Sequence, residues 1–233
     1  MTVTEIPRSH EGINLQHLRE LLDELNGKLL EMSRLVEDSI ARSVDAVIHR
    51  DHEAASVVFD NEDRINKLEI LIDNIAIRLL ALQQPVAMDL RFVTMSIKIN
   101  NNLERMGDIA VNIAERALSL LGMPLVKPNI DIPYMAKLAQ DMISSSIDAF
   151  VRRDPDLARR VLGSDDTVDR LRDEMYAEII RFMEEDPSRI HPGIDHLLVA
   201  RGLERLADHA TNIAEDVLFF VQGIDVRHHA EFR

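Results

Sequence analysis

The sequence predicts an all-α protein built as a tandem duplication of two antiparallel three-helix bundles. Residues 101–120 and 201–220 lie one hundred positions apart and are identical at ten of twenty positions. Along most of the chain, apolar residues recur every three or four positions, which is the period of an amphipathic helix. Only eight Gly and eight Pro occur in 233 residues, and this scarcity favours long helices over sheets.

The repeat extends well beyond its most similar segment. Residues 43–51 match 146–154 at an offset of 103, and the offset falls to 100 near residue 185. The change of offset implies a slightly shorter turn in the second half. A duplication of about 100 residues is therefore the organising feature of the chain.

Three helices are expected in the first half. An apolar stripe runs through residues 25–47, and a second one follows over 65–82 until Gln84-Pro85 interrupts it. The third helix is expected over about 88–121, closed by Gly122. Because long helices joined by short turns pack antiparallel, these three should form one bundle.

The second half repeats this pattern. Helices are expected near 131–153, 155–184 and 192–222, with breaks at Asp154-Pro155 and Asp186-Pro187. The predicted domain organisation is an N-terminal tail (1–13), a first bundle (14–122), a linker (123–130), a second bundle (131–223) and a C-terminal tail (224–233).

Composition excludes several classes of protein. A formal net charge of −14 argues against unaided binding to nucleic acid, whose phosphates would be repelled. The chain has no cysteine, which rules out disulfides and thiolate metal sites. No apolar run reaches the roughly 20 residues of a membrane-spanning helix, and the N-terminus has no apolar signal core. We therefore expect a soluble, cytoplasmic protein.

Polar residues of the third helix repeat in both halves, although packing alone does not require them. With about 100° per residue, Glu104, Asp108, Asn112 and Glu115 fall within about 80° of one another, roughly opposite the apolar stripe. The second half repeats this oxygen-bearing stripe with Glu204, Asp208, Asn212 and Glu215. The stripe should therefore lie on the surface rather than in a buried pocket.

Antiparallel packing brings further oxygen ligands to the same height. Folding at the turn near residue 86 places Asp63 and Asn66 beside the stripe of the first half, and Asp166 and Asp169 are their counterparts. Asp38 and Asp141 of the first helices fall at a similar level. Carboxylates and amides without cysteine suit hard or borderline cations such as Mg²⁺, Mn²⁺ and iron.

One simpler interpretation remains open for the residues of the stripe. Acidic side chains opposite an apolar stripe also form the solvated face of an ordinary amphipathic helix. The pair His228-His229 lies in a polar tail and receives no role. No catalytic machinery is evident either: no Gly-rich phosphate loop occurs, and no glutamate has a histidine three residues later, as a di-iron bundle requires. An enzyme is therefore not expected.

These residues together resemble the PhoU family. The first half carries QPVAMDLR at 84–91, then LERMGD at 103–108 and NIAE at 112–115. The second half carries ARGLERLADHATNIAED at 200–216, which is similar to the second signature of that family. The resemblance covers about residues 15–222.

The resemblance implies both a site and a function. PhoU-like proteins bind iron, Mn²⁺ or Mg²⁺ at such surfaces, which points to Glu104, Asp108, Glu204 and Asp208 as metal ligands. Asn112 and Asn212 follow one turn later, and the helix register extends the set to Asp63, Asn66, Asp166 and Asp169. The family pattern also implies dimers.

A PhoU-like protein would act as a negative regulator of phosphate uptake and of the phosphate-starvation response. Its expected partners are the ATPase subunit of the phosphate ABC transporter and the phosphate-sensing histidine kinase, so that it reaches the membrane only through proteins. The alternative is a metal-dependent phosphate-ester hydrolase or a metal store that uses the same carboxylates. A hydrolase would need an enclosed pocket and a positioned nucleophile, which an outward-facing stripe does not offer.

Overall fold

A computed structural model describes residues 9–123 and 128–223, and these residues form helices and turns without any strand. This confirms the predicted fold class. The elements are, in order, α1 (Ser9–His49), α2 (His52–Arg78), a π-helical turn η1 (Leu79–Gln83), α3 (Ala87–Leu121), α4 (Ile132–Arg152), α5 (Pro155–Leu162), α6 (Asp165–Glu185), a 3-10 turn η2 (Pro187–Arg189) and α7 (Ile190–Gln222).

Aspartates set the starts of helices in both halves. The side chain of Asp51 accepts hydrogen bonds from the backbone N–H groups of Glu53 and Ala54, and Asp154 caps α5 in the same way. Such a cap satisfies amides that have no partner inside the helix. The residue before each cap, Arg50 or Arg153, has a positive φ of 56° or 53°. The same left-handed turn therefore occurs at equivalent places, 103 positions apart.

The structure differs from the sequence prediction in the second half. One helix was expected over 155–184, but α5 and α6 are separate helices that meet at Gly163 and Ser164. Glycine is a poor helix former, and the Ser164 hydroxyl donates to the carbonyl oxygen of Arg160. Both effects favour ending α5 at this point, although each alone is weak.

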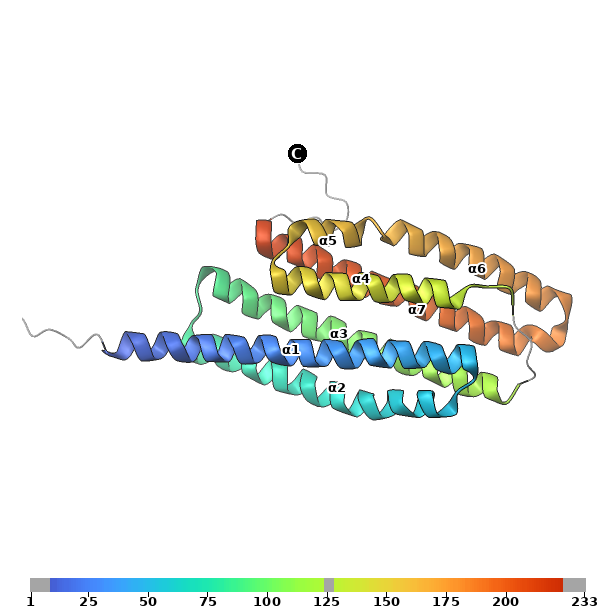
Figure 1. Cartoon of the computed structure of the whole chain (residues 1–233), viewed down its shortest axis with the longest axis horizontal. Helices are drawn as coiled ribbons and strands as arrows, with labels where there is room; N and C mark the ends of the chain where they lie inside the picture. Colours follow the sequence, from blue (N-terminus) through green and yellow to red (C-terminus); the bar gives the residue numbers. More distant parts are fainter. Residues whose placement is uncertain (1–8, 124–127, 224–233) are drawn as a thin grey trace, which may run out of the picture.

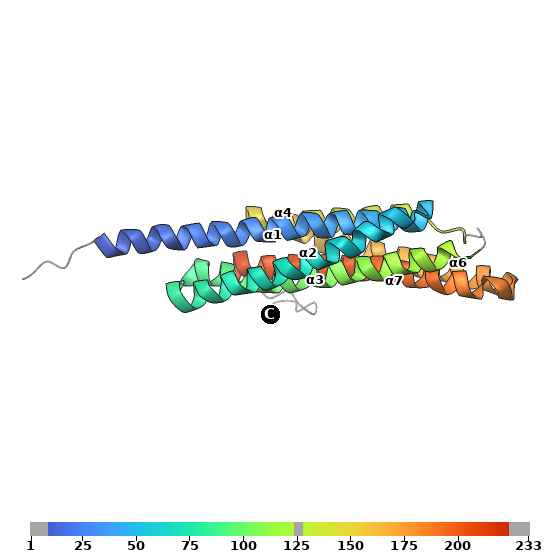
Figure 2. The same cartoon turned by 90° about the horizontal axis from the view of Figure 1, so that it is seen from below.

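The helices form two layers (Figures 1 and 2). In Figure 1 α6 and α2 lie at opposite edges, with α7 and α3 between them, and Figure 2 shows α1 and α4 together on one side. Helix α1 packs on α2 and α3, while α4 packs on α7, and α3 and α7 are in extensive contact. The two bundles are therefore joined side by side through their third helices.

One hydrophobic core runs through both bundles. It is continuous because α3 and α7 meet closely: a Cβ atom added to Gly202 would lie 3.0 Å from Cγ1 of Ile113 and 3.6 Å from Ile109. An equivalent contact joins His209 Nδ1 to Asn102 Oδ1 at 2.9 Å. Since His209 corresponds to Ile109 and Asn102 to Gly202, the α3–α7 contact has an approximate two-fold axis.

The predicted domain boundaries are only partly within the described residues. Helix α1 begins at Ser9, inside the stretch predicted as an N-terminal tail. Most of that tail, linker residues 124–127 and the C-terminal tail with His228-His229 lie outside the described residues, so these predictions stay untested. Among the described residues, no helix has both the length and the apolar character needed to cross a bilayer.

Candidate functional site

The first candidate site is a strip of carboxylates between α2 and α3. Glu62 of α2 is close enough to feel the charge of Asp108 of α3, and Glu104 of α3 feels that of Glu69 of α2. We call these four residues the α2–α3 seam. Partial burial raises the pKa of Glu104, and the negative charges of Asp108 and Glu69 raise it further. Partial burial and the charge of Asp108 likewise raise the pKa of Glu62. The seam therefore gathers like charges that repel one another.

Basic groups offset little of this charge. Arg105 Nε lies 3.5 Å from Glu104 Oε2, and its side chain is 57% exposed. An exposed pair of that kind contributes little, because water screens it. The seam is thus close to an uncompensated group of acids.

An unsatisfied acceptor lies between α2 and α3. The side-chain amide of Asn100 is buried and donates from Nδ2 to the carbonyl oxygen of Glu69 and to Asp73 Oδ1, both at 3.0 Å. Because both partners accept, this side of the amide must carry the NH₂ group. Its Oδ1 atom is left buried without a hydrogen bond among the described residues.

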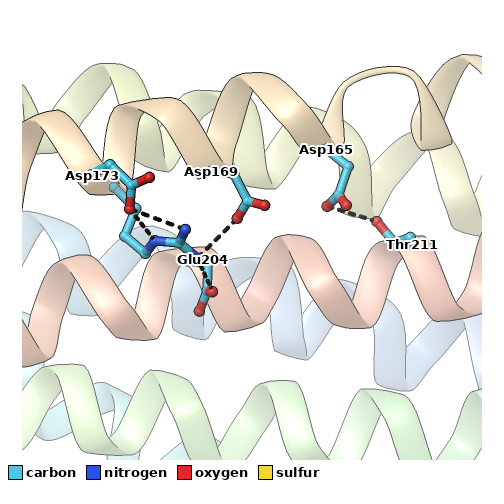
Figure 3. Close-up of polar contacts among 6 residues, drawn as sticks. Asp165, Asp169, Asp173, Glu204 and Thr211 are labelled. Atoms are coloured by element: carbon cyan, nitrogen blue, oxygen red, sulfur yellow. Dashed lines mark hydrogen bonds and ion pairs between the residues drawn. The ribbon is translucent and has the colours of Figure 1, made fainter.

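The second candidate site lies between α6 and α7. Asp165 and Asp169 of α6 face Glu204 and Asp208 of α7, and we call these four residues the α6–α7 seam. Here a basic side chain joins the acids: Arg172 Nη1 lies 2.5 Å from Glu204 Oε1 and 2.9 Å from Asp169 Oδ1 (Figure 3).

The same guanidinium makes a third acidic contact, since Arg172 Nη2 lies 3.1 Å from Asp173 Oδ1. Partial burial alone would lower the pKa of Arg172, but its hydrogen bonds to Asp173 and Glu204 raise it. Arg172 is therefore a permanent cation within the α6–α7 seam.

Negative charges also lie close together at the Asp165 and Asp208 end of the α6–α7 seam. Partial withdrawal from water, together with the charges of Glu204, Asp165 and Asp169, raises the pKa of Asp208 to about 6, although Arg172 opposes the shift. Partial burial also raises the pKa of Asp165, whose carboxylate accepts a hydrogen bond from the Thr211 hydroxyl at 3.2 Å (Figure 3). Among the carboxyl groups of the two seams, Asp208 thus has the pKa that is raised most.

The structure brings some predicted ligands together and not others. Glu104, Asp108, Glu204, Asp208 and Asp169 belong to the seams. Asp63 and Asp166 are exposed and lie beside them, as neighbours of Glu62 and Asp165. Asn66 is half-buried on α2, between Glu62 and Glu69 in sequence.

The two predicted asparagines of the third helices are not in the seams. Asn112 donates from Nδ2 to the backbone oxygen of Asp108, within its own helix. Asn212 lines an open groove between α3 and α7 with Lys98 and Asp216. Asp38, expected at the same level, binds Arg42 and Asn61 between α1 and α2.

Sequence reasoning missed Glu62, Glu69, Asp165 and Arg172. A signal for the first and third was available, because Glu62 and Asp165 are both acidic at the offset of 103. The same alignment pairs Glu69 with Arg172, where the charge changes sign, so no repeat-based search would find either.

The α2–α3 seam offers four carboxylates, a ligand type that Mg²⁺ and Mn²⁺ accept. Within residues 9–123 and 128–223, no three His, Cys, Asp or Glu side chains already surround a metal position. Ligation would therefore require the carboxylates to move closer together. A metal at either seam stays a prediction.

Comparison with known proteins agrees with the duplicated architecture. The family model for the PhoU domain matches the chain twice, at residues 29–117 and 132–217. The phosphate-specific transport system accessory protein PhoU homolog of Zymomonas mobilis subsp. mobilis is 36% identical over 215 residues, covering 92% of this chain and 91% of the relative. The homolog of the same name from Pseudomonas aeruginosa is 37% identical over 214 residues, covering 91% and 88%.

Solved structures show the same fold. The crystal structure of PhoU from Pseudomonas aeruginosa gives a TM-score of 0.84 at 36% identity and covers 88% of this chain and 99% of that one. The phosphate transport system regulatory protein PhoU from Streptococcus pneumoniae gives a TM-score of 0.80 at 29% identity, covering 90% and 99%. These relatives carry the names of accessory and regulatory proteins rather than of enzymes. With two domain matches and two relatives above 30% identity over nine tenths of its length, the chain belongs to the PhoU family.

Proposed function

We propose that the protein is a non-enzymatic adaptor that restrains phosphate uptake and the phosphate-starvation response. The observation that carries this proposal is the likeness over nearly the full length to relatives named as accessory proteins of phosphate-specific transport. The geometry agrees, because the acidic groups lie along outer helix seams. A surface of this kind suits contact with other proteins better than chemistry on a small substrate.

The proposed partners are the ATPase subunit of a phosphate ABC transporter and a phosphate-sensing histidine kinase. The protein would meet both on the cytoplasmic side of the membrane, as a homodimer that is held there through proteins. Large apolar side chains are exposed near the end of the first bundle, including Leu82 (68%) and Val86 (74%). Exposed apolar groups at one end are suited to docking.

Deletion of the gene tests the regulatory role. Reporters of phosphate-starvation genes should stay active in high phosphate in the deletion strain, and wild-type protein should silence them again. Normal repression in the deletion strain would refute the negative role.

Co-purification tests the adaptor role. Tagged protein should retain the ATPase subunit or the kinase, and Leu82→Glu with Val86→Glu should weaken that retention at unchanged helicity. If these variants still bind both partners, the docking surface lies elsewhere on the protein. If the wild-type protein binds neither partner, the adaptor role is contradicted. Turnover of phosphate esters by the metal-replete protein, abolished by Asp108→Asn, would favour the hydrolase.

We also propose that cation binding at the seam carboxylates supports this role. Glu62, Glu69, Glu104 and Asp108 would hold the cation, which supplies positive charge where the acids repel one another. Elemental analysis of protein purified without added metal tests this proposal. Binding should also raise the thermal midpoint, because the cation binds only the folded chain. A metal-free protein whose thermal midpoint does not change on addition of Mn²⁺ or Mg²⁺ would contradict the proposed cation binding.

A further inference from the structure

A hollow of about 290 Å³ lies between the two bundles and shares no residue with either seam. One face of α1 lines it together with the first turns of α3, and the end of α4 lines it from the second bundle. Its polar side chains are Arg19, Asp23, Asn26, Asp89 and Arg153. The hollow thus collects two arginines and two aspartates, whose formal charges cancel.

These opposite charges are not paired with one another. Among the described residues, the five polar side chains of the hollow form no side-chain hydrogen bond and no ion pair. Asn26 and Asp89 are half-buried, so water and salt screen them less than groups on an open surface. A ligand could therefore bind these groups without first breaking a contact within the protein.

The duplication shows that Arg153 is released from a structural task. Its equivalent in the first bundle is Arg50, and both residues have the left-handed backbone, with φ of 53° and 56°. Nη2 of Arg50 donates to the carbonyl oxygens of Leu121 and Met123. Within the described chain the guanidinium of Arg153 makes no such bond, and it lies 5.7 Å from the centre of the Phe220 ring. Its N–H donors are therefore available to a ligand.

A cluster of aromatic rings supports one wall of the hollow. Phe92 of α3 stacks on Phe150 of α4 with ring centres 5.3 Å apart, and Phe220 of α7 is tilted against both. Phe92, Leu22 and Val151 supply the apolar part of the lining. Because the rings come from both bundles, the shape of the hollow depends on how the bundles meet.

A lining of this kind selects ligands that carry both charges. The aspartates would repel a simple anion, and the arginines would repel a simple cation. A carboxylate matches the planar N–H donors of arginine, and an ammonium group donates to aspartate oxygens. Apolar walls with a few polar groups are typical of sites for small molecules. The best match is a small zwitterion with an apolar side chain.

We propose that this hollow binds a free α-amino acid with an apolar side chain. Its carboxylate would lie on Arg19 and Arg153, and its ammonium group on Asp23 and Asp89. The ligand would contact both bundles at once. It would therefore bind only the folded arrangement that brings α1 to the turn between α4 and α5, and so stabilise that arrangement.

Leucine and two of its analogues test the site on the full-length protein by calorimetry and thermal unfolding. Leucine should bind and raise the thermal midpoint. Isocaproate lacks only the amino group of leucine, and isoamylamine lacks only the carboxylate. Each should bind at least about tenfold more weakly than leucine, because each loses hydrogen bonds between charged groups.

Substitutions locate the site. Arg153→Gln should weaken leucine binding at least about tenfold, whereas Arg152→Gln, its neighbour outside the hollow, should leave binding unchanged. Asp89→Asn should weaken the binding of leucine but not that of isocaproate, for which it removes a repelling charge. Circular dichroism checks that each variant is folded, and Arg19→Gln replaces Arg153→Gln if the latter does not fold.

Three results would overturn the proposal. The first is a wild-type protein that binds no leucine at millimolar concentration. The second is equal affinity for leucine and isocaproate, which would leave the ammonium group without a role. The third is an unchanged affinity for leucine in the folded arginine variants, which would place the ligand outside this hollow.

Discussion

Gly107 of α3 lies directly against Ile65 of α2, so that a Cβ atom at Gly107 would stand 3.2 Å from Ile65 Cδ1. At the equivalent positions the second bundle has Ala207 and Val168, both buried. One carbon has been added on the third helix and one removed on the second. The total side-chain volume of the pair is therefore conserved between the bundles, as close packing demands.

This pair predicts a positive coupling between two substitutions. Ile65→Val alone should lower the free energy of unfolding by about 1 kcal/mol. Gly107→Ala should be better tolerated in the Ile65→Val background than in the wild type, with a coupling of at least about 0.5 kcal/mol. Urea denaturation of the four proteins in the cycle measures it. Purely additive effects would show that the helices separate freely at this contact.

A larger side chain at Gly202 should destabilise the contact between α3 and α7. Because a Cβ atom there would lie 3.0 Å from Ile113 Cγ1, Gly202→Leu should push α7 away from α3. Overpacking of this kind costs about 1–3 kcal/mol. The control is Gly27→Ala, since nothing lies within 4 Å of a Cβ atom at Gly27 and the change should raise stability by about 0.5–1 kcal/mol. Equal thermal midpoints for Gly202→Leu and wild type would rule out this close contact.

Arg50 should stabilise the end of α3 from the turn before α2. Its Nη2 atom donates to the carbonyl oxygens of Leu121 at 2.8 Å and Met123 at 2.7 Å. Arg50→Ala keeps a non-glycine residue at this positive φ, so it removes mainly these charged hydrogen bonds, worth about 1.5–3 kcal/mol. Arg152→Ala, which breaks an exposed pair with Asp148, should cost less than about 1 kcal/mol. Equal losses of unfolding free energy would contradict the capping role.

Asp208 predicts how stability depends on pH. Its pKa is raised to about 6 in the folded chain, against about 3.9 in an unfolded one. Between these values the folded state binds more protons than the unfolded state, so stability falls as the pH rises through this window. The charged groups around Asp208 are Glu204 on its own helix and Asp165, Asp169 and Arg172 on α6. The three acids raise its pKa, and Arg172 lowers it.

Asp208→Asn removes this dependence. In a chelator-containing buffer it should raise the thermal midpoint at pH 7, and the gain over wild type should vanish near pH 4, where the acid is uncharged. Asp60→Asn, exposed on α2, is the matched control and should leave the pH profile unchanged. A gain that is the same at pH 4 and pH 7 would assign the effect to packing rather than charge.

Much of the fold followed from the repeat and from helical periodicity. The predicted breaks at Pro85 and Asp154 lie where the structure ends one helix and starts the next. The break at Gly163 was missed because its two signals, one glycine and one serine, are each compatible with a continuous helix. Only the packing of α5 beside α4 and α7 resolves them.

The site was harder to predict than the fold. The register brought α2 to the correct height beside α3, yet it favoured Asp63 where the structure places Glu62 in the seam. Neighbouring residues on a helix point about 100° apart. A small error in the assumed orientation of α2 therefore selects an exposed residue in place of the one in the seam. Arg172 could not be foreseen either, because its three acidic contacts come from two helices.

The approximate two-fold axis between α3 and α7 has a consequence for the half-chain. Gly202 against Ile109 and Asn102 against His209 are the same contact seen from each side, as in an isologous dimer of identical subunits. A single half made alone would expose this face to water and would need a second copy to cover it. Fusion in one polypeptide keeps the interface at an effective concentration that no dilution can lower. It also allows the two partners to diverge, which a dimer encoded by one gene cannot do.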